Sequence, residues 1–106
     1  MIRVLLDENL PRKLKWLLNA DALTVPERGW GGVQNGRLLG LAALEFDVLL
    51  TMDRGIEHQQ NLSSLDLCII VLSAVSNDID DLRPLVPSIN AAFLQATPGR
   101  LIRVSV

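Results

Sequence analysis

The chain has 106 residues, of which 49% are hydrophobic and 21% charged, with a net charge of −2 and a single cysteine. This length suits one domain with a buried core, and the composition excludes an intrinsically disordered chain. The apolar runs are far shorter than the roughly 20 residues that a membrane-spanning helix needs, and the N-terminus shows no secretory signal pattern. Because one cysteine cannot form an internal disulfide, we expect a cytoplasmic protein.

The charges are unevenly distributed along the chain. Basic residues dominate between Arg12 and Arg37, and acidic residues dominate between Glu45 and Asp81. An acidic centre beside a basic helix would hold a cation and attract a phosphate backbone. Ordinary solvated helix faces account for the same pattern, so the charge distribution leaves both interpretations open.

The predicted elements alternate between strands and helices. Strands are expected over residues 2–6, 23–25, 47–51, 67–72 and 101–106, and helices over residues 11–19, 35–45 and 80–95, with a further short helix in the polar stretch 53–64. Pro11 fits the first turn of the first helix, where its missing N–H needs no partner, with Asn9 or Leu10 as the N-cap. The glycine-rich segment 29–36 lacks a nucleotide-binding motif and is predicted to be a flexible connection.

The last predicted helix contains two prolines. Asp80 or Asp81 would begin it, which puts Pro84 in its first turn, where proline is tolerated. Pro87 lies further along and either kinks the helix or delays its true start.

This alternation predicts a three-layer α/β fold with a mostly parallel central sheet of about five strands, and one domain over residues 1–106. The last strand alternates between apolar and polar residues, which is compatible with an antiparallel orientation at an edge of the sheet. Cys68 lies in the continuous apolar run 67–72 and is expected to pack in the core.

Acidic residues follow two of the predicted strands. Asp7 and Glu8 come directly after the first strand, and Asp53 follows the strand 47–51. The carboxyl ends of parallel strands share one edge, where open α/β folds bind their ligands. Asp7 and Asp53 are therefore expected to lie close together, where two carboxylates bind a cation such as Mg²⁺ or shift each other's pKa. The purely structural alternative is that Asp7 and Glu8 cap a helix and Asp53 begins a turn.

The segments around these acids resemble a known family. LLDENLP at residues 5–11 and LLTMDR at residues 49–54 resemble the small bacterial proteins of the DUF5615 PIN-like family, which are related to PIN-domain toxins. Shorter segments are similar to one branch of that family, namely GWGG at 29–32, NG at 35–36, LL at 38–39, EFDV at 45–48 and QQNL at 59–62. The resemblance covers nearly the whole chain.

The resemblance implies a PIN-type fold and a ribonuclease that depends on Mg²⁺ or Mn²⁺, often the toxin of a toxin–antitoxin pair. By this likeness Asp7 and Asp53 would bind the metal that activates a water against an RNA phosphodiester, with Glu8 as a further catalytic carboxylate. Arg54 would neutralise phosphate charge. The implied partners are an RNA substrate, an antitoxin protein and a second copy of the chain in a homodimer, with no membrane involved.

One position departs from the family pattern. PIN-like relatives carry an acidic residue at the start of the helix after the glycine-rich loop, where this chain has Arg37. A cation beside two carboxylates would weaken metal binding by charge compensation. Arg37 would instead bind a substrate phosphate, or Glu8 would replace the missing acid. Gln59 and Asn61 are further candidates for orienting water or contacting RNA, with a plain helix surface as the alternative.

Two other functions stay open. An inactive PIN-like interaction module would keep the fold and lose the chemistry through Arg37. A phosphoacceptor receiver domain would use Asp53 with Ser73 as its hydroxyl, but it needs a lysine after the last strand, and no lysine follows Lys15. Trp30 in the glycine-rich segment is either a base-stacking platform or an anchor packed on the core, and His58 is expected at the surface.

Overall fold

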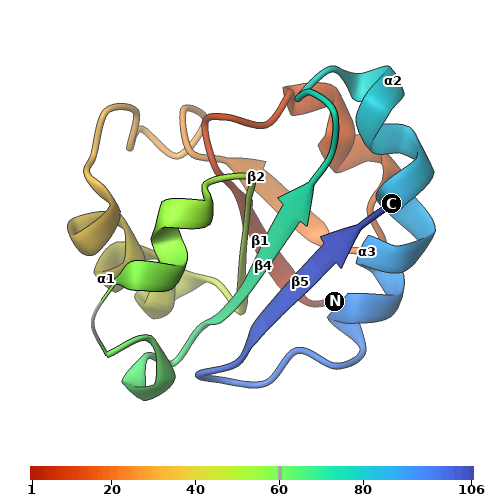
Figure 1. Ribbon diagram of the computed structural model, residues 1–106. Helices are drawn as coiled ribbons and strands as arrows, with labels where there is room; N and C mark the ends of the chain where they lie inside the picture. Colours follow the sequence, from red (N-terminus) through yellow and green to blue (C-terminus); the bar gives the residue numbers. More distant parts are fainter. Residues whose placement is uncertain (60) are drawn as a thin grey trace.

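The computed structural model describes residues 1–59 and 61–106, and over these residues it contains a single five-stranded sheet in which every strand is parallel to its neighbours. The strands are β1 (Arg3–Leu6), β2 (Asp21–Thr24), β3 (Val48–Thr51), β4 (Cys68–Ser73) and β5 (Leu101–Ser105). They lie in the order β2-β1-β3-β4-β5 (Figure 1). The predicted α/β class and parallel sheet are confirmed, and the strand bounds differ from the predicted ones by at most two residues.

The helices connect successive strands. The α-helices are α1 (Asn35–Glu45), α2 (Ile79–Leu82) and α3 (Val86–Phe93), and the 3₁₀ helices are η1 (Arg12–Leu17), η2 (Arg54–His58), η3 (Leu62–Ser64) and η4 (Arg83–Leu85). Helix α1 has the bounds that were predicted for it. Within the described residues, no helix is long and apolar enough to cross a bilayer.

The first helix is shorter and more tightly wound than the predicted helix over 11–19. Pro11 is the N-cap of η1, with an extended backbone (φ −71°, ψ 140°), so neither Asn9 nor Leu10 is the cap and Pro11 is outside the first turn. A 3₁₀ helix rises about 2.0 Å per residue, so the six residues of η1 span about 12 Å. That span is close to the length of a four-residue strand, about 13 Å. One short 3₁₀ helix is therefore enough to bring the chain back to the start of β2.

The last helical region begins earlier than predicted and is divided. Asp78 caps it by accepting a hydrogen bond from the backbone N of Asp80 at 2.9 Å, so neither Asp80 nor Asp81 is the cap. Pro84 lies in the 3₁₀ turn η4, and Pro87 lies in the first turn of α3. Because proline cannot donate a backbone hydrogen bond, each one marks the beginning of a new turn. Pro87 thus delays the start of the long helix.

Strand β5 is parallel to β4, so the antiparallel edge orientation that its alternating pattern left open is not adopted. The helices α2, η4 and α3 carry the chain back along the sheet, so β5 begins at the same end as β4. The alternation in sequence reflects an edge strand that is covered on one face. Val104 is buried, whereas Arg103 and Ser105 are exposed.

Two hydrophobic clusters pack on opposite faces of the sheet. Leu6 belongs to the cluster that includes residues of η1, α2 and α3, and its neighbour Leu5 belongs to the cluster that includes residues of α1 and η2. Figure 1 shows α1 on one side of the strands and α2 and α3 on the other. Cys68 lies in the first cluster, as predicted, and burial raises the pKa of its thiol.

Candidate functional site

The candidate site lies where β1 and β3 end. These two strands are neighbours, with Leu6 paired to Leu50, and the backbone N of Asp7 continues the pairing by donating to the carbonyl oxygen of Leu50 at 2.9 Å. From β1 the chain goes to β2 on one side of the sheet and then returns to β3 on the other. This is the topological switch point, where open α/β sheets bind ligands beyond the carboxyl ends of their strands.

A single buried hydroxyl connects the two acidic segments. Thr51 Oγ1 donates to Asp7 Oδ2 at 2.7 Å. The same oxygen accepts from the backbone N of Asp53 at 3.0 Å and from Asn9 Nδ2 at 3.3 Å. Because a hydroxyl offers one donor and two lone pairs, Thr51 uses all of its capacity here. Thr51 is fully buried and Asp7 is 6% exposed, so this network holds the end of β1 against the end of β3.

The Asp53 carboxylate is held from two directions. Its Oδ1 accepts from the backbone N of Gly55 at 2.8 Å, which caps η2. Its Oδ2 accepts from Asn35 Nδ2 at 2.8 Å, at the first residue of α1. The turn that was the structural alternative for Asp53 is therefore present. The same carboxylate also contacts α1, and each of its oxygens keeps a lone pair that can accept further.

The start of α1 brings a neutral amide to this site instead of a cation. Asn35 contacts Asp53, whereas Arg37 is exposed and lines a separate pocket of about 420 Å³. The other residues of that pocket are Gly31, Gly32, Val33 and Gln34. Among the described residues, no ion pair joins Arg37 to either aspartate. The geometry therefore lacks the direct charge compensation that Arg37 suggested in the sequence.

Glu8 is turned toward the glycine-rich loop. Its Oε1 accepts from the backbone N of Gly32 at 3.1 Å. Gly32 has a φ of +80°, a left-handed conformation that favours glycine. Over residues 1–59 and 61–106, no group of three or more His, Cys, Asp or Glu side chains is arranged to hold a metal ion. What the strand ends offer is a pair of carboxylates, Asp7 and Asp53.

The polar candidates that follow η2 lie in different surroundings. Gln59 is the C-cap of η2, and a Cβ atom added to Gly36 would lie 3.9 Å from its Oε1, so Gln59 lies close to the start of α1. Asn61 has a left-handed φ of 64° and begins η3 at an exposed turn. His58 is exposed, as predicted.

The two tryptophans have opposite environments. Trp30 packs edge to face on Phe46, with ring centroids 6.1 Å apart, and the Arg28 guanidinium lies 4.6 Å from the Trp30 centroid. Trp30 is thus the loop anchor and not an open stacking platform. Trp16 of η1 is 71% exposed, and the Lys15 ammonium lies 4.6 Å from its ring centroid.

A second group of polar residues lies further along the same edge of the sheet. The sequence pointed to Arg54 and Ser73 but not to Glu57 or Arg103. Arg54 donates to the hydroxyl of Ser73 at the end of β4. Arg103 of β5 binds Glu57 of η2 through two hydrogen bonds of 2.7 and 2.9 Å, and this pairing lowers the pKa of Glu57. No local motif marks Arg103, because its position beside η2 arises only when β5 pairs with β4.

Comparison of the chain with protein-family models, with curated proteins and with solved structures gives no match. The likeness to the PIN-like family therefore rests on the sequence segments alone, and the geometry of the strand ends carries the functional argument.

Proposed function

We propose that this protein is a PIN-like endoribonuclease that depends on Mg²⁺ or Mn²⁺. The observation that carries the proposal is the pair Asp7 and Asp53, which follow neighbouring parallel strands and are joined through the Thr51 hydroxyl. Hard divalent cations take oxygen ligands, usually one or two carboxylates, and complete their coordination with water and substrate phosphate oxygens. The donor set at this switch point fits such a cation.

The residues around the pair have distinct roles in this proposal. Asp7 and Asp53 would hold the metal, which supplies an activated water and polarises the phosphodiester. Thr51 and Asn35 orient the two carboxylates by donating hydrogen bonds to them. Arg54 follows Asp53 directly and offers positive charge to the RNA backbone.

The remaining candidates lie around this centre. Glu8 holds the glycine-rich loop beside the site, and Gln59 lies near the start of α1. Arg37 and Asn61 are exposed and would contact the RNA strand away from the metal. In this proposal the protein acts in the cytoplasm on RNA, an antitoxin protein would restrain it, and a homodimer would be its assembled form.

The direct test is cleavage of single-stranded RNA with Mg²⁺ or Mn²⁺. Wild-type protein is expected to cleave with metal and to stop when a chelator is added, and Asp53→Asn should abolish cleavage because it removes one of the two charged ligands. Asp66→Asn is the matched control, since it makes the same chemical change at an exposed aspartate that precedes β4. Cleavage that survives in Asp53→Asn would refute the proposal.

A weakened site would behave differently in the same assay. If the wild type is inert with both metals while Arg37→Glu gains cleavage, the protein is an interaction module whose chemistry has been lost. Arg37 is exposed beside the glycine-rich loop and, among the described residues, forms no ion pair with either aspartate, which favours the active nuclease over this alternative.

The strand order favours a second candidate function. The order β2-β1-β3-β4-β5 is also that of receiver-type doubly wound domains. In this alternative Asp53 would be the phosphoacceptor and Ser73, at the end of β4, the hydroxyl that contacts the phosphoryl group. Incubation with a small phosphodonor, followed by mass spectrometry, separates the two functions. The absence of phosphorylation at Asp53 removes the receiver alternative.

A further inference from the structure

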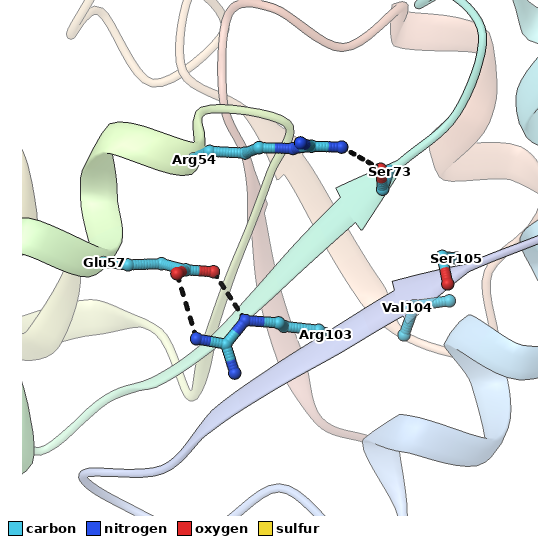
Figure 2. A pocket seen from close by; sticks show the side chains of 6 residues that line it. All are labelled: Arg54, Glu57, Ser73, Arg103, Val104 and Ser105. Atoms are coloured by element: carbon cyan, nitrogen blue, oxygen red, sulfur yellow. Dashed lines mark hydrogen bonds and ion pairs between the residues drawn. The ribbon is translucent and has the colours of Figure 1, made fainter.

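The carboxyl edge of the sheet carries a second pocket, next to the site formed by Asp7 and Asp53, here called the two-carboxylate site. It has a volume of about 340 Å³ and lies between η2 and the ends of β4 and β5. Its lining residues are Arg54, Glu57, Ser73, Arg103, Val104 and Ser105. Figure 2 shows Arg54 reaching from η2 to Ser73 and Arg103 reaching from β5 back to Glu57, so two arginines span the pocket in opposite directions.

The strand register explains why these side chains converge. Ser73 is paired with Ser105 across β4 and β5, so both hydroxyl groups lie on the same face of the sheet. Arg103 is two positions before Ser105 and therefore points to that face too. Strand β3 contributes to the pocket as well as β4 and β5. Asp53 follows β3 and begins η2, which places Arg54 over the same face.

The lining has the chemistry of an oxyanion site. Each guanidinium offers up to five N–H donors in a planar fork that matches phosphate oxygens, and each serine adds a hydroxyl donor. Glu57 is the only acidic residue of the pocket, so two positive charges stand against one negative charge. Val104 also borders the pocket, while its side chain packs in the cluster on the opposite face of the sheet.

We propose that this pocket binds a phosphate group. Arg54 and the Ser73 hydroxyl are already within hydrogen-bond distance of each other, so their donors are in place before a ligand enters. The site needs no metal and stands independently of RNA cleavage. Because Arg54 directly follows Asp53, the bound phosphate lies beside the two-carboxylate site along the edge of the sheet.

Glu57 competes with the phosphate for Arg103. The pair makes two hydrogen bonds, yet the Arg103 side chain is 68% exposed and can be reached from solvent. An incoming phosphate must exchange places with the Glu57 carboxylate to use this guanidinium. Glu57→Gln should therefore tighten phosphate binding, because it removes the competing charge. A purely structural ion pair between η2 and β5 would leave the phosphate affinity unchanged when Glu57 is replaced.

The test is an NMR titration of ¹⁵N-labelled protein with inorganic phosphate, without divalent metal and at an ionic strength held constant with sodium chloride. We expect saturable shifts of the backbone amides at Ser73 and Ser105. Arg54→Gln should weaken binding about tenfold or more, because it removes a charge-assisted hydrogen bond. Glu57→Gln should tighten binding about tenfold. Arg83→Gln, an exposed arginine of η4 outside the pocket, is the matched control and should bind as wild type does.

Two further ligands identify the source of the phosphate. A short RNA with a 5′-phosphate and the same RNA without it are titrated into Asp53→Asn, which prevents cleavage in the proposed nuclease. Preference for the phosphorylated RNA assigns the pocket to a terminal phosphate, and equal binding at the pocket assigns it to a backbone phosphate. Absence of saturable shifts with inorganic phosphate, or equal loss of affinity in Arg54→Gln and Arg83→Gln, overturns the proposal. Because no metal is present, this outcome is separate from the result of the cleavage assay.

Discussion

Replacing Thr51 with valine tests whether one hydroxyl holds the two acidic strand ends together. Valine keeps the β-branched shape that suits a strand and removes only the hydroxyl. Thr51 is fully buried, so water cannot take the place of the lost group. The substitution therefore separates the hydrogen bonds of this side chain from its packing.

The expected loss follows from the contacts. The hydroxyl donates to the Asp7 carboxylate at 2.7 Å, and a hydrogen bond to a charged group contributes about 1.5–3 kcal/mol. It also accepts from the backbone N of Asp53 at 3.0 Å, a neutral bond that contributes about 1 kcal/mol. Thr51→Val should thus lower the free energy of unfolding by about 3 kcal/mol, a large fraction of the roughly 5–15 kcal/mol typical of a domain.

Urea denaturation followed by far-UV circular dichroism measures this loss. With a slope of about 2 kcal/mol per molar urea, Thr51→Val should lower the midpoint by about 1.5 M. Thr51→Ser is the control, because it keeps the hydroxyl and loses one methyl group, at a cost of about 1 kcal/mol. In an Asp7→Asn background the effect of Thr51→Val should shrink, since the charged partner is gone. Equal destabilisation by valine and serine would refute the reasoning.

Three further substitutions have expected outcomes that urea midpoints can check. Gly99→Ala should destabilise the fold by about 2 kcal/mol or more. Gly99 has a φ of +81°, and an added Cβ would collide with the carbonyl oxygen of Ser63. A variant as stable as the wild type would contradict this. Gly40→Ala in α1 should stabilise by about 0.5–1 kcal/mol, since an added Cβ meets nothing within 4 Å there; a loss of stability would show a contact that the structure lacks. The hydrogen bond from Lys15 lowers the pKa of Glu27 from 4.5 to about 2. The stabilisation that the ionised Glu27 carboxylate gives to the fold is therefore complete above pH 4.5 and is lost as the pH falls toward 2. Glu27→Gln should flatten the pH dependence of the midpoint in that window, and an unchanged slope would argue against the assignment.

The elements differ in how well the sequence could predict them. Helix α1 was predictable because its buried residues Leu38, Leu39 and Ala42 recur at helical spacing. The segment 12–17 is also rich in leucine, but whether it forms an α-helix or a 3₁₀ helix depends on the distance back to β2. That distance is a property of the sheet. The direction of β5 is likewise decided by the helices that precede it, since an alternating pattern suits an edge strand in either direction.

The sequence by itself determined where the strands end and which of those ends are acidic. Apolar runs and the acids that follow them are local features, so Asp7 and Asp53 could be named without a structure. Only the tertiary structure decided what surrounds them. The hydrogen bond from Thr51 to Asp7 joins residues 44 positions apart, and it exists because β1 and β3 are neighbours in the sheet. The order of strands depends on how whole helices and strands pack together, and no local pattern of residues encodes that order.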